Sequence, residues 1–248
     1  MTATRQLALP FVHAPRLAEA DFLPSVANRP ALAWLGRGAD WPGRRLALWG
    51  GSGSGKTHLL HIWATRAGAS LINGSTLRHT PLGDEWPLAL GPLAPGPLAI
   101  DDADLAPSET TLLHVLNAAQ EARHPVLLAA RTPPARWPTR LPDLASRLRA
   151  TAAVPLGAPD DAFLRTLLAR LLSDRQLLVP GPVQDWLLAE LPREPAALRE
   201  AAARLDRAAL AAGRGVTRTL AARTLQPLMQ ENSEAESLDV SPPHPGLF

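Results

Sequence analysis

The sequence predicts an α/β protein: a parallel sheet of five strands with helices on both faces, followed by a small helical domain. Short apolar segments alternate with helical segments as far as Pro159, and a glycine-rich loop joins the first strand to the next helix. After Pro159 every periodic segment has the helical period. A chain of 248 residues is long enough for one large and one small domain.

Five apolar segments have the length and composition of short buried strands. Because helices alternate with them, we expect a parallel sheet covered on both faces. The strands are expected at 46–49, 71–72, 98–100, 126–130 and 152–154. The helices between them are expected at 30–35, 56–67 and 108–122, with Ser108 as an N-cap and Gly68 as a stop signal. Residues 74–96, rich in Pro and Gly, indicate no element.

The second domain is predicted from four helical segments at 161–172, 183–191, 196–212 and 217–228. The tail has four acidic residues, no basic residue and three prolines, so we expect it to be disordered. The predicted organisation is an extended arm at 1–18, a nucleotide-binding core at 19–158, a helical lid at 159–229 and the tail at 230–248.

Composition excludes several classes of function. The chain has no cysteine, which excludes disulfides, thiolate metal sites and thiol catalysis. The isoelectric point near 10.2 is misleading, because the net charge is only +2 and no dense basic stripe is present. We find no signal peptide, and prolines and glycines interrupt the longest apolar stretch, so we predict a cytoplasmic protein without a membrane span.

The strongest motif is a glycine-rich loop that matches G-x-x-x-x-G-K-[ST] between a predicted strand and a predicted helix. Its backbone N–H groups and the helix N-terminus would hold the phosphates of ATP or ADP. Lys56 would reach the β and γ phosphates, and Thr57 would bind Mg²⁺. Lys56 is also the one lysine among 25 basic residues, so a compact ammonium is kept where arginine is used elsewhere. The predicted nucleotide-binding residues are Gly50, Gly51, Ser52, Gly53, Ser54, Gly55, Lys56, Thr57 and His58.

A second motif is an apolar strand that ends in Asp101 and Asp102. About 45 residues after such a loop, this pattern is typical of the Walker B arrangement. Asp101 would hold the Mg²⁺ shell, and Asp102 would orient the attacking water. Aspartate is shorter than the glutamate usual at the second position, so fast turnover does not follow from the motif.

Several runs resemble the replication initiator DnaA and its truncated relatives, the Hda regulators. Residues 48–60 are similar to the P-loop region of both, and LPDLASRL at 141–148 is similar to the Hda segment before the lid. Arg193-Glu194, Leu198 and 205–208 resemble the Hda lid. The resemblance covers about residues 6–228 and implies an AAA+ core with a helical lid.

The resemblance gives Arg147 a role. In the family the arginine of the Ser-Arg pair points to a nucleotide held by a neighbouring subunit, where it neutralises charge in the transition state. The alternative is an ordinary surface or salt-bridging arginine, of which the chain offers 23 others.

The sequence also departs from the family. The second-sensor arginine falls on Ala196, although Arg193 or Arg199 could substitute. The first-sensor region, 129–132, lacks the expected polar side chain unless Thr132 serves. We therefore expect very slow hydrolysis by the chain itself, with ADP or ATP held as a structural cofactor.

The N-terminal run QLALPF resembles the sliding-clamp-binding motif that the Hda family carries at this end. An extended peptide with a buried amide and apolar anchors suits insertion into a hydrophobic groove. The predicted contacts with the clamp of DNA polymerase III are Gln6, Leu7, Leu9, Pro10 and Phe11.

These features favour a negative regulator of chromosome replication that is tethered to the clamp, reaches DNA through it, and promotes hydrolysis of DnaA-bound ATP. An autonomous ATPase that loads or remodels DNA-bound proteins is the main alternative. A small-molecule kinase and an adaptor that does not need Lys56 are two others. The sequence leaves the oligomeric state open, a homo-oligomer included.

Overall fold

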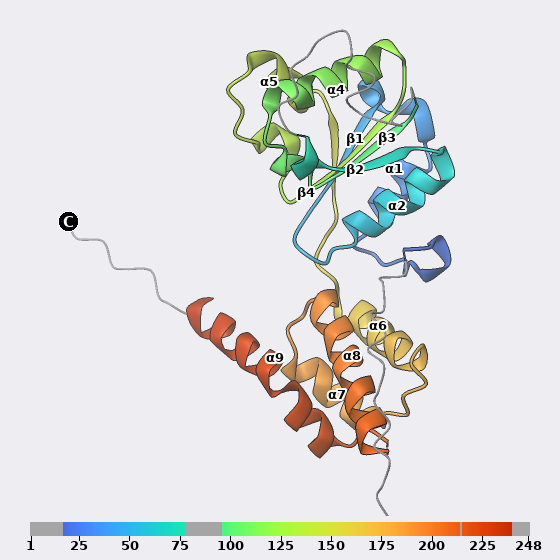
Figure 1. The fold of residues 1–248 in the computed structure, drawn as a ribbon, viewed down its shortest axis with the longest axis vertical. Helices are drawn as coiled ribbons and strands as arrows, with labels where there is room; N and C mark the ends of the chain where they lie inside the picture. The colour runs from blue at the N-terminus through green and yellow to red at the C-terminus, as the bar shows by residue number, and fades with distance from the viewer. Residues whose placement is uncertain (1–16, 78–95, 214, 240–248) are drawn as a thin grey trace, which may run out of the picture. The chain divides into compact units, whose positions relative to one another are not determined.

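The computed structural model describes residues 17–77, 96–213 and 215–239. They form two compact units, which divide between Ala158 and Pro159 (Figure 1). The first unit carries the sheet and the second is helical. Within the described residues, no helix is both long and apolar enough to cross a membrane.

The sheet of the first unit has five parallel strands in the order β2-β3-β4-β1-β5. The predicted five-stranded parallel sheet is thus confirmed, and each strand lies within two residues of its expected position. The bounds are β1 Arg45–Trp49, β2 Ser70–Asn73, β3 Leu98–Asp101, β4 Val126–Ala130 and β5 Ala152–Pro155.

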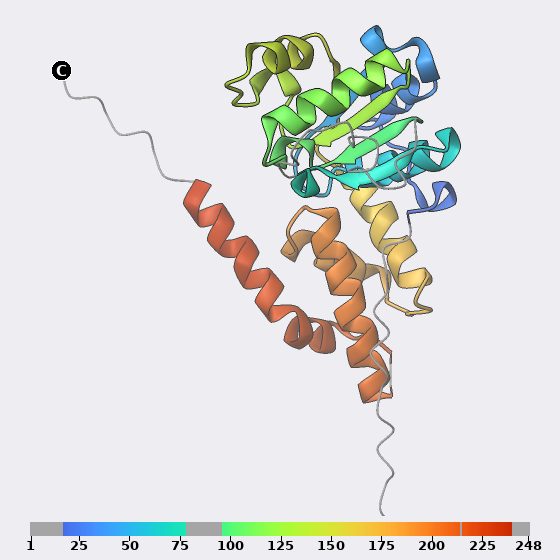
Figure 2. The ribbon, with the colours of Figure 1, turned by 45° about the horizontal axis from the view of Figure 1, so that its top comes forward.

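Helices cover both faces of this sheet, α1 and α2 one face and α4 and α5 the other (Figures 1 and 2). Alternation along the strands divides the core accordingly: Leu46 and Leu48 pack with the first pair, and Ala47 packs with the second. Each fully buried leucine contributes roughly 1.5–3 kcal/mol to stability. The bounds are α1 Arg29–Leu35, α2 Lys56–Ala67, α4 Glu109–Glu121 and α5 Pro142–Arg149.

Helix α5 was not expected from periodicity. It has eight residues, of which only Leu144 and Leu148 are buried. One i,i+4 pair is too short a pattern to distinguish a helix from a loop. Pro142 at the start of the helix and Asp143 in its first turn are both favourable there.

The described residues of the second unit form four helices, in which α6 packs on α7 and α8, and α9 packs on α7 and α8. Asp160 caps the first of them by accepting a hydrogen bond of 2.7 Å from the Phe163 N–H. Leucine side chains such as Leu168, Leu172 and Leu205 fill the interior. The bounds are α6 Asp161–Ser173, α7 Gly181–Glu190, α8 Pro195–Ala212 and α9 Arg218–Asp239.

Helix α9 continues through Asp239, and so it includes the first ten residues of the tail expected at 230–248. The expectation weighed acidity and prolines together, but all three prolines follow residue 241. Residues 230–239 contain three Glu and one each of Gln, Ala and Leu, all good helix formers. Residues 240–248 lie outside the described part of the chain.

A close backbone approach holds the ends of β2 and β3 together. A Cβ added at Gly74 would lie 2.3 Å from the Asp102 carbonyl oxygen and 2.9 Å from Ala103 Cα. Backbone atoms cannot yield as a flexible side chain can, so only glycine fits at this position.

We expect Gly74→Ala to lower the free energy of unfolding by about 1–3 kcal/mol, the usual range for overpacking. Gly36→Ala is the control within the same unit, because its Cβ would meet atoms only at the ordinary distance of 3.5 Å. Urea unfolding of both variants checks this, and equal stabilities would contradict the close approach.

Candidate functional site

The glycine-rich loop lies between β1 and α2, at the carboxyl edge of the sheet. Gly55 precedes α2 with φ +96°, a conformation that favours glycine, and no side chain caps the helix. The first N–H groups of α2 therefore have neither an intrahelical acceptor nor a side-chain cap. Together with the helix dipole, they make this end of α2 suitable for phosphate.

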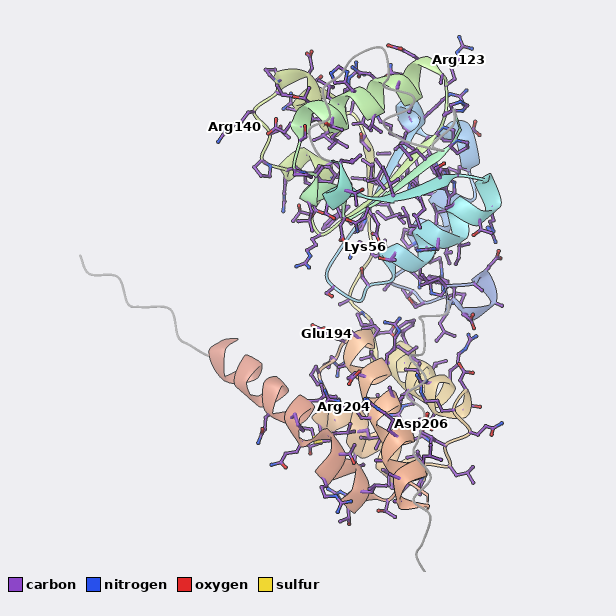
Figure 3. All side chains as sticks on the ribbon, in the orientation of Figure 1. Lys56, Arg123, Arg140, Glu194, Arg204 and Asp206 are labelled. Carbon is purple, nitrogen blue, oxygen red and sulfur yellow. The ribbon has the colours of Figure 1, made fainter. Side chains whose placement is uncertain are left out.

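Lys56 is the buried cation of this loop (Figure 3). Its ammonium donates to the carbonyl oxygens of Gly50 at 2.8 Å and Gly51 at 2.7 Å, and to Ser54 Oγ at 3.3 Å. Burial lowers the pKa of Lys56, while the carboxylates of Asp101 and Asp102 oppose that shift. Three neutral acceptors position the charge without neutralising it, so the ammonium remains attractive to an anion such as a phosphate.

Thr57 and Asp101 form the pair expected to bind a divalent metal ion. The Thr57 hydroxyl donates to Asp101 Oδ2 at 2.8 Å, across from α2 to the end of β3. A hydroxyl and a carboxylate at this separation are the oxygen ligands that Mg²⁺ takes from a protein beside nucleotide phosphates. The residues present therefore fit the predicted magnesium role, which remains a prediction.

Asp102 stands in a special backbone conformation directly after β3, with φ +48°. Its carboxylate accepts a hydrogen bond of 3.3 Å from the Asn73 amide at the end of β2. Asn73 was missed by the sequence analysis, although the pairing of β2 with β3 puts it opposite Asp101. This contact orients Asp102, the residue predicted to position the attacking water.

Arg131, directly after β4, is a cation that the sequence analysis did not assign to the site. Arg131 follows Ala130, the last residue of β4, and lies close enough to Lys56 for its positive charge to lower the pKa of Lys56. The Arg131 N–H donates to Asp104 Oδ2 at 2.9 Å. The first-sensor region thus offers Arg131 beside the loop, while the Thr132 carbonyl accepts from the Trp137 ring N–H.

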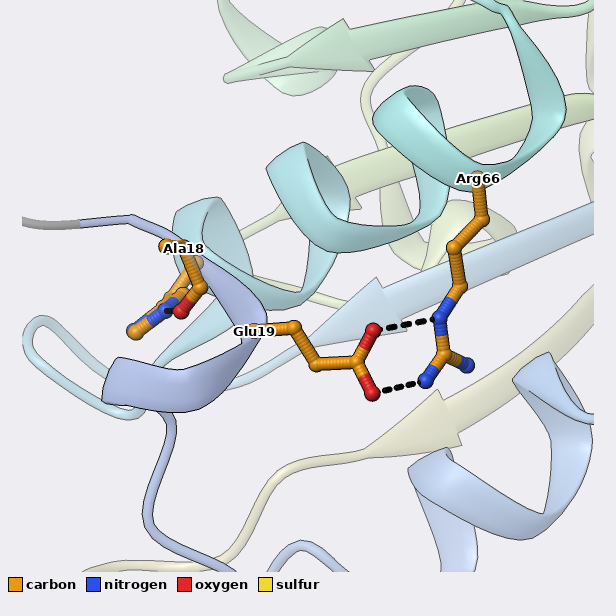
Figure 4. A network of polar contacts seen from close by, with 4 residues as sticks. Ala18, Glu19 and Arg66 are labelled. Carbon is orange, nitrogen blue, oxygen red and sulfur yellow. Dashed lines mark hydrogen bonds and ion pairs between the residues drawn. The ribbon is translucent and has the colours of Figure 1, made fainter.

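Residues 17–22 pass beside the start of α2 (Figure 4). The Ala18 carbonyl lies 2.9 Å from His58 Nε2, and the Phe22 ring meets the His58 ring edge-on. Glu19 and Arg66 form a two-bonded ion pair further along the helix, and the Arg66 Nε bond is 2.8 Å long. His58 thus holds this segment against α2, and its predicted contact with nucleotide remains a prediction.

Arg147 lies near the opposite edge of the sheet. It belongs to the last turn of α5, which precedes the start of β5, whereas the glycine-rich loop follows the end of β1. Its guanidinium donates to Gln120 Oε1 at 2.7 Å. The structure therefore separates Arg147 from the other predicted site residues of the first unit.

The second-sensor candidates belong to the helical unit. Ala196, in the first turn of α8, is exposed and offers no polar group. Arg193 forms an ion pair with Asp161, so its guanidinium has a partner inside this unit. Arg199, one turn beyond Ala196, makes no hydrogen bond or ion pair with any other described residue. Of the two proposed substitutes, Arg199 is the one with a free guanidinium.

The predicted clamp-binding residues, Gln6, Leu7, Leu9, Pro10 and Phe11, lie outside the described residues. The clamp contact therefore rests on the sequence motif alone.

No protein-family model matches the chain, and a search of curated proteins finds no match. Solved structures do match. Domain III of the Thermotoga maritima replication initiation protein DnaA aligns with a TM-score of 0.74 at 19% identity, over 88% of this chain and 98% of that one. AMPPCP-bound DnaA from Aquifex aeolicus aligns with a TM-score of 0.59 at 17% identity, over 91% and 71%. The Thermotoga maritima RuvB Holliday junction branch migration motor aligns with a TM-score of 0.61 at 17% identity, over 80% and 68%.

These likenesses define the class of fold. The chain shares the fold of these structures, a five-stranded parallel sheet covered by helices and followed by a small helical domain. Identities below 20% establish the fold alone, and function is argued from the site.

We expect Lys56→Ala to weaken nucleotide binding by roughly 10- to 100-fold, because charge-assisted hydrogen bonds to phosphate are lost. Titration with fluorescently labelled ADP measures the change. Thr65→Ala on the exposed side of the same helix is the control and should bind as the parent does. Equal affinities of the two variants would show that the loop does not hold phosphate.

Proposed function

We propose that this chain is a nucleotide-bound AAA+ regulator of replication initiation that promotes hydrolysis of ATP held by DnaA. The observation that carries the proposal is the separation of Lys56 and Arg147. Strand β1, five residues or roughly 16 Å long, lies between the two edges of the sheet. Arg147 therefore cannot act on a nucleotide held by its own loop. It suits a nucleotide held by another molecule.

The chain's own site supports nucleotide binding more than fast turnover. Lys56, Thr57 and Asp101 supply a phosphate contact and two magnesium ligands. The residue at the water-positioning place is Asp102, which is short and already hydrogen-bonded to Asn73. ADP or ATP with Mg²⁺ would then act as a bound cofactor that fixes the shape of the loop.

Tethering completes the proposal. The motif that contains Gln6 and Phe11 would insert into the groove of the polymerase III sliding clamp. The clamp would bring the regulator to DNA, and binding to it would raise the local concentration at initiators nearby. The likeness in fold to domain III of DnaA is what supports DnaA as the partner.

The second candidate is an autonomous ATPase that acts on DNA-bound proteins. The likeness to RuvB, a branch migration motor, favours it. So does Arg131, a cation close to Lys56 at the tip of β4.

Steady-state phosphate release by the isolated chain separates the two candidates. We expect turnover well below about 1 s⁻¹, the low end for ordinary enzymes, with or without DNA. Turnover above that value that rises with DNA would exclude the regulator and support the motor-like ATPase.

The proposed regulator is tested on ATP preloaded onto DnaA, with DNA-loaded clamp. We expect clamp-dependent acceleration of hydrolysis, and we expect Arg147→Ala to remove most of it, since arginine fingers are worth about 10³–10⁵ in rate. Gln6→Ala should reduce only the part of the acceleration that requires the clamp. Arg149→Ala, an exposed arginine two residues away, is the matched control and should retain acceleration. Full acceleration by Arg147→Ala would refute the role of that residue.

A further inference from the structure

Two arginines converge on one neutral side chain at the amino edge of the sheet. Arg45, the first residue of β1, donates to Gln120 Oε1 at 3.0 Å, and Arg147 donates to the same oxygen at 2.7 Å. Gln120 belongs to α4 and Arg147 to α5, so three separate elements build this cluster. We name Arg45, Gln120 and Arg147 the amino-edge cluster.

Arg45 is an unusual member because it is buried without an anion. Its exposed fraction is 6%, and its Nε has no hydrogen-bond partner among the described residues. Among the described residues, no carboxylate forms an ion pair with Arg45 or Arg147. Burial lowers the pKa of Arg45, and the charge of Arg147 adds to this shift. A buried guanidinium that has no anion is costly and indicates a specific use.

The surroundings add more positive charge. Strands β1, β4 and β5 are neighbours in the sheet and start at this edge, and each is preceded by basic residues. Figure 3 shows one of them, Arg123, at the end of the unit away from Lys56. The ionisable residues next to these strand starts are Arg44, Arg123, His124, Arg149 and one acid, Glu121.

We propose that the amino-edge cluster is a phosphate-binding site, in which Arg147 contacts the anion and Arg45 supplies a second charge behind it. Gln120 is a positioning residue that holds both guanidinium groups. The occupant is the terminal phosphate of a nucleotide held by a second protein molecule, and this part rests on the proposed function. The inference goes further by making Arg45 and Gln120 necessary for the action of Arg147.

The chemistry of the cluster favours an anion with several oxygens. Arg147 uses one donor on Gln120, and a guanidinium has five, in a fork that matches phosphate. Gln120 is neutral, so it fixes the direction of the fork without cancelling its charge. A nucleic-acid backbone is contacted by exposed cations, whereas Arg45, the second charge of the cluster, is buried.

Inorganic pyrophosphate is the direct probe. The full chain, kept saturated with ADP in magnesium-free buffer so that the glycine-rich loop is occupied, is titrated by calorimetry at low salt. We expect binding that Arg45→Met weakens roughly tenfold, since methionine fills the buried space without the charge. Arg136→Met removes the same charge from an exposed position outside this set of residues and should change affinity by no more than about twofold. Equal effects of the two substitutions, or no binding by the parent chain, would overturn the site.

Gln120→Glu separates a binding role from a structural one. A carboxylate at this position would pair with both arginines, so we expect the midpoint temperature of unfolding to rise by roughly 2–4 °C. Pyrophosphate affinity should fall about tenfold at the same time, because the positive charge is neutralised. A more stable variant that binds pyrophosphate as before would show that the cluster only holds the fold together.

An assay with DnaA preloaded with ATP tests whether the bound phosphate belongs to a nucleotide on the partner protein. If Arg45→Met and Gln120→Glu reduce acceleration of hydrolysis as Arg147→Ala does, the occupant is a nucleotide on the partner. If pyrophosphate binds as expected but no variant alters an initiator's hydrolysis, the phosphate site stands and the proposed regulator fails. If short DNA competes with pyrophosphate and nucleotide-loaded protein does not, the proposed occupant is wrong.

Discussion

The parallel direction of five short strands is the constraint on which the rest of this molecule depends. All carboxyl ends of the strands meet at one edge, which brings Asn73, Asp101 and the glycine-rich loop together although they are far apart in sequence. All amino ends meet at the other edge, where Arg45 and Arg147 converge. Because β1 spans the distance between these edges, the two chemistries cannot share one nucleotide. The proposed phosphate site at the amino edge would therefore be distinct from the glycine-rich loop at the carboxyl edge.

At both edges of the sheet, neutral oxygen atoms accept the hydrogen bonds of the buried cations. Lys56 is held by the carbonyl oxygens of Gly50 and Gly51, and the arginines at the other edge are held by a glutamine oxygen. Carbonyl and amide oxygens orient a cation and leave its charge largely intact, while a bonded carboxylate would neutralise it. The carboxylates of Asp101 and Asp102 act on Lys56 without a hydrogen bond to it, and Asp101 accepts instead from the Thr57 hydroxyl. At both edges, therefore, neutral oxygens position the cation and leave its positive charge available to attract an anion.

Local pattern was enough to predict the strands, the loop and most helices, since each has its own signal within a few residues. Three features could not be found that way. Helix α5 has one buried i,i+4 pair, and the helical extension to Asp239 was hidden by prolines that come only after residue 241. The contact of Arg45 with Gln120 joins residues 75 positions apart, and depends on how β1 and α4 pack. The close approach of Gly74 to the Asp102 carbonyl likewise joins segments far apart in sequence.

The strength of the Gln120 contact matters for any action of Arg147 on a partner. A hydrogen bond from a charged donor to a neutral acceptor contributes roughly 1.5–3 kcal/mol, enough to hold a long side chain in one direction. An incoming phosphate offers charged oxygens in bidentate geometry, which are stronger acceptors than the amide oxygen. In the proposed site Arg147 would bind phosphate through its remaining donors and keep its bond to Gln120, whose amide Arg45 also holds in place. A glutamate at position 120 would orient the guanidinium but cancel its charge, and so glutamine suits an arginine that must be held in place and still attract an anion.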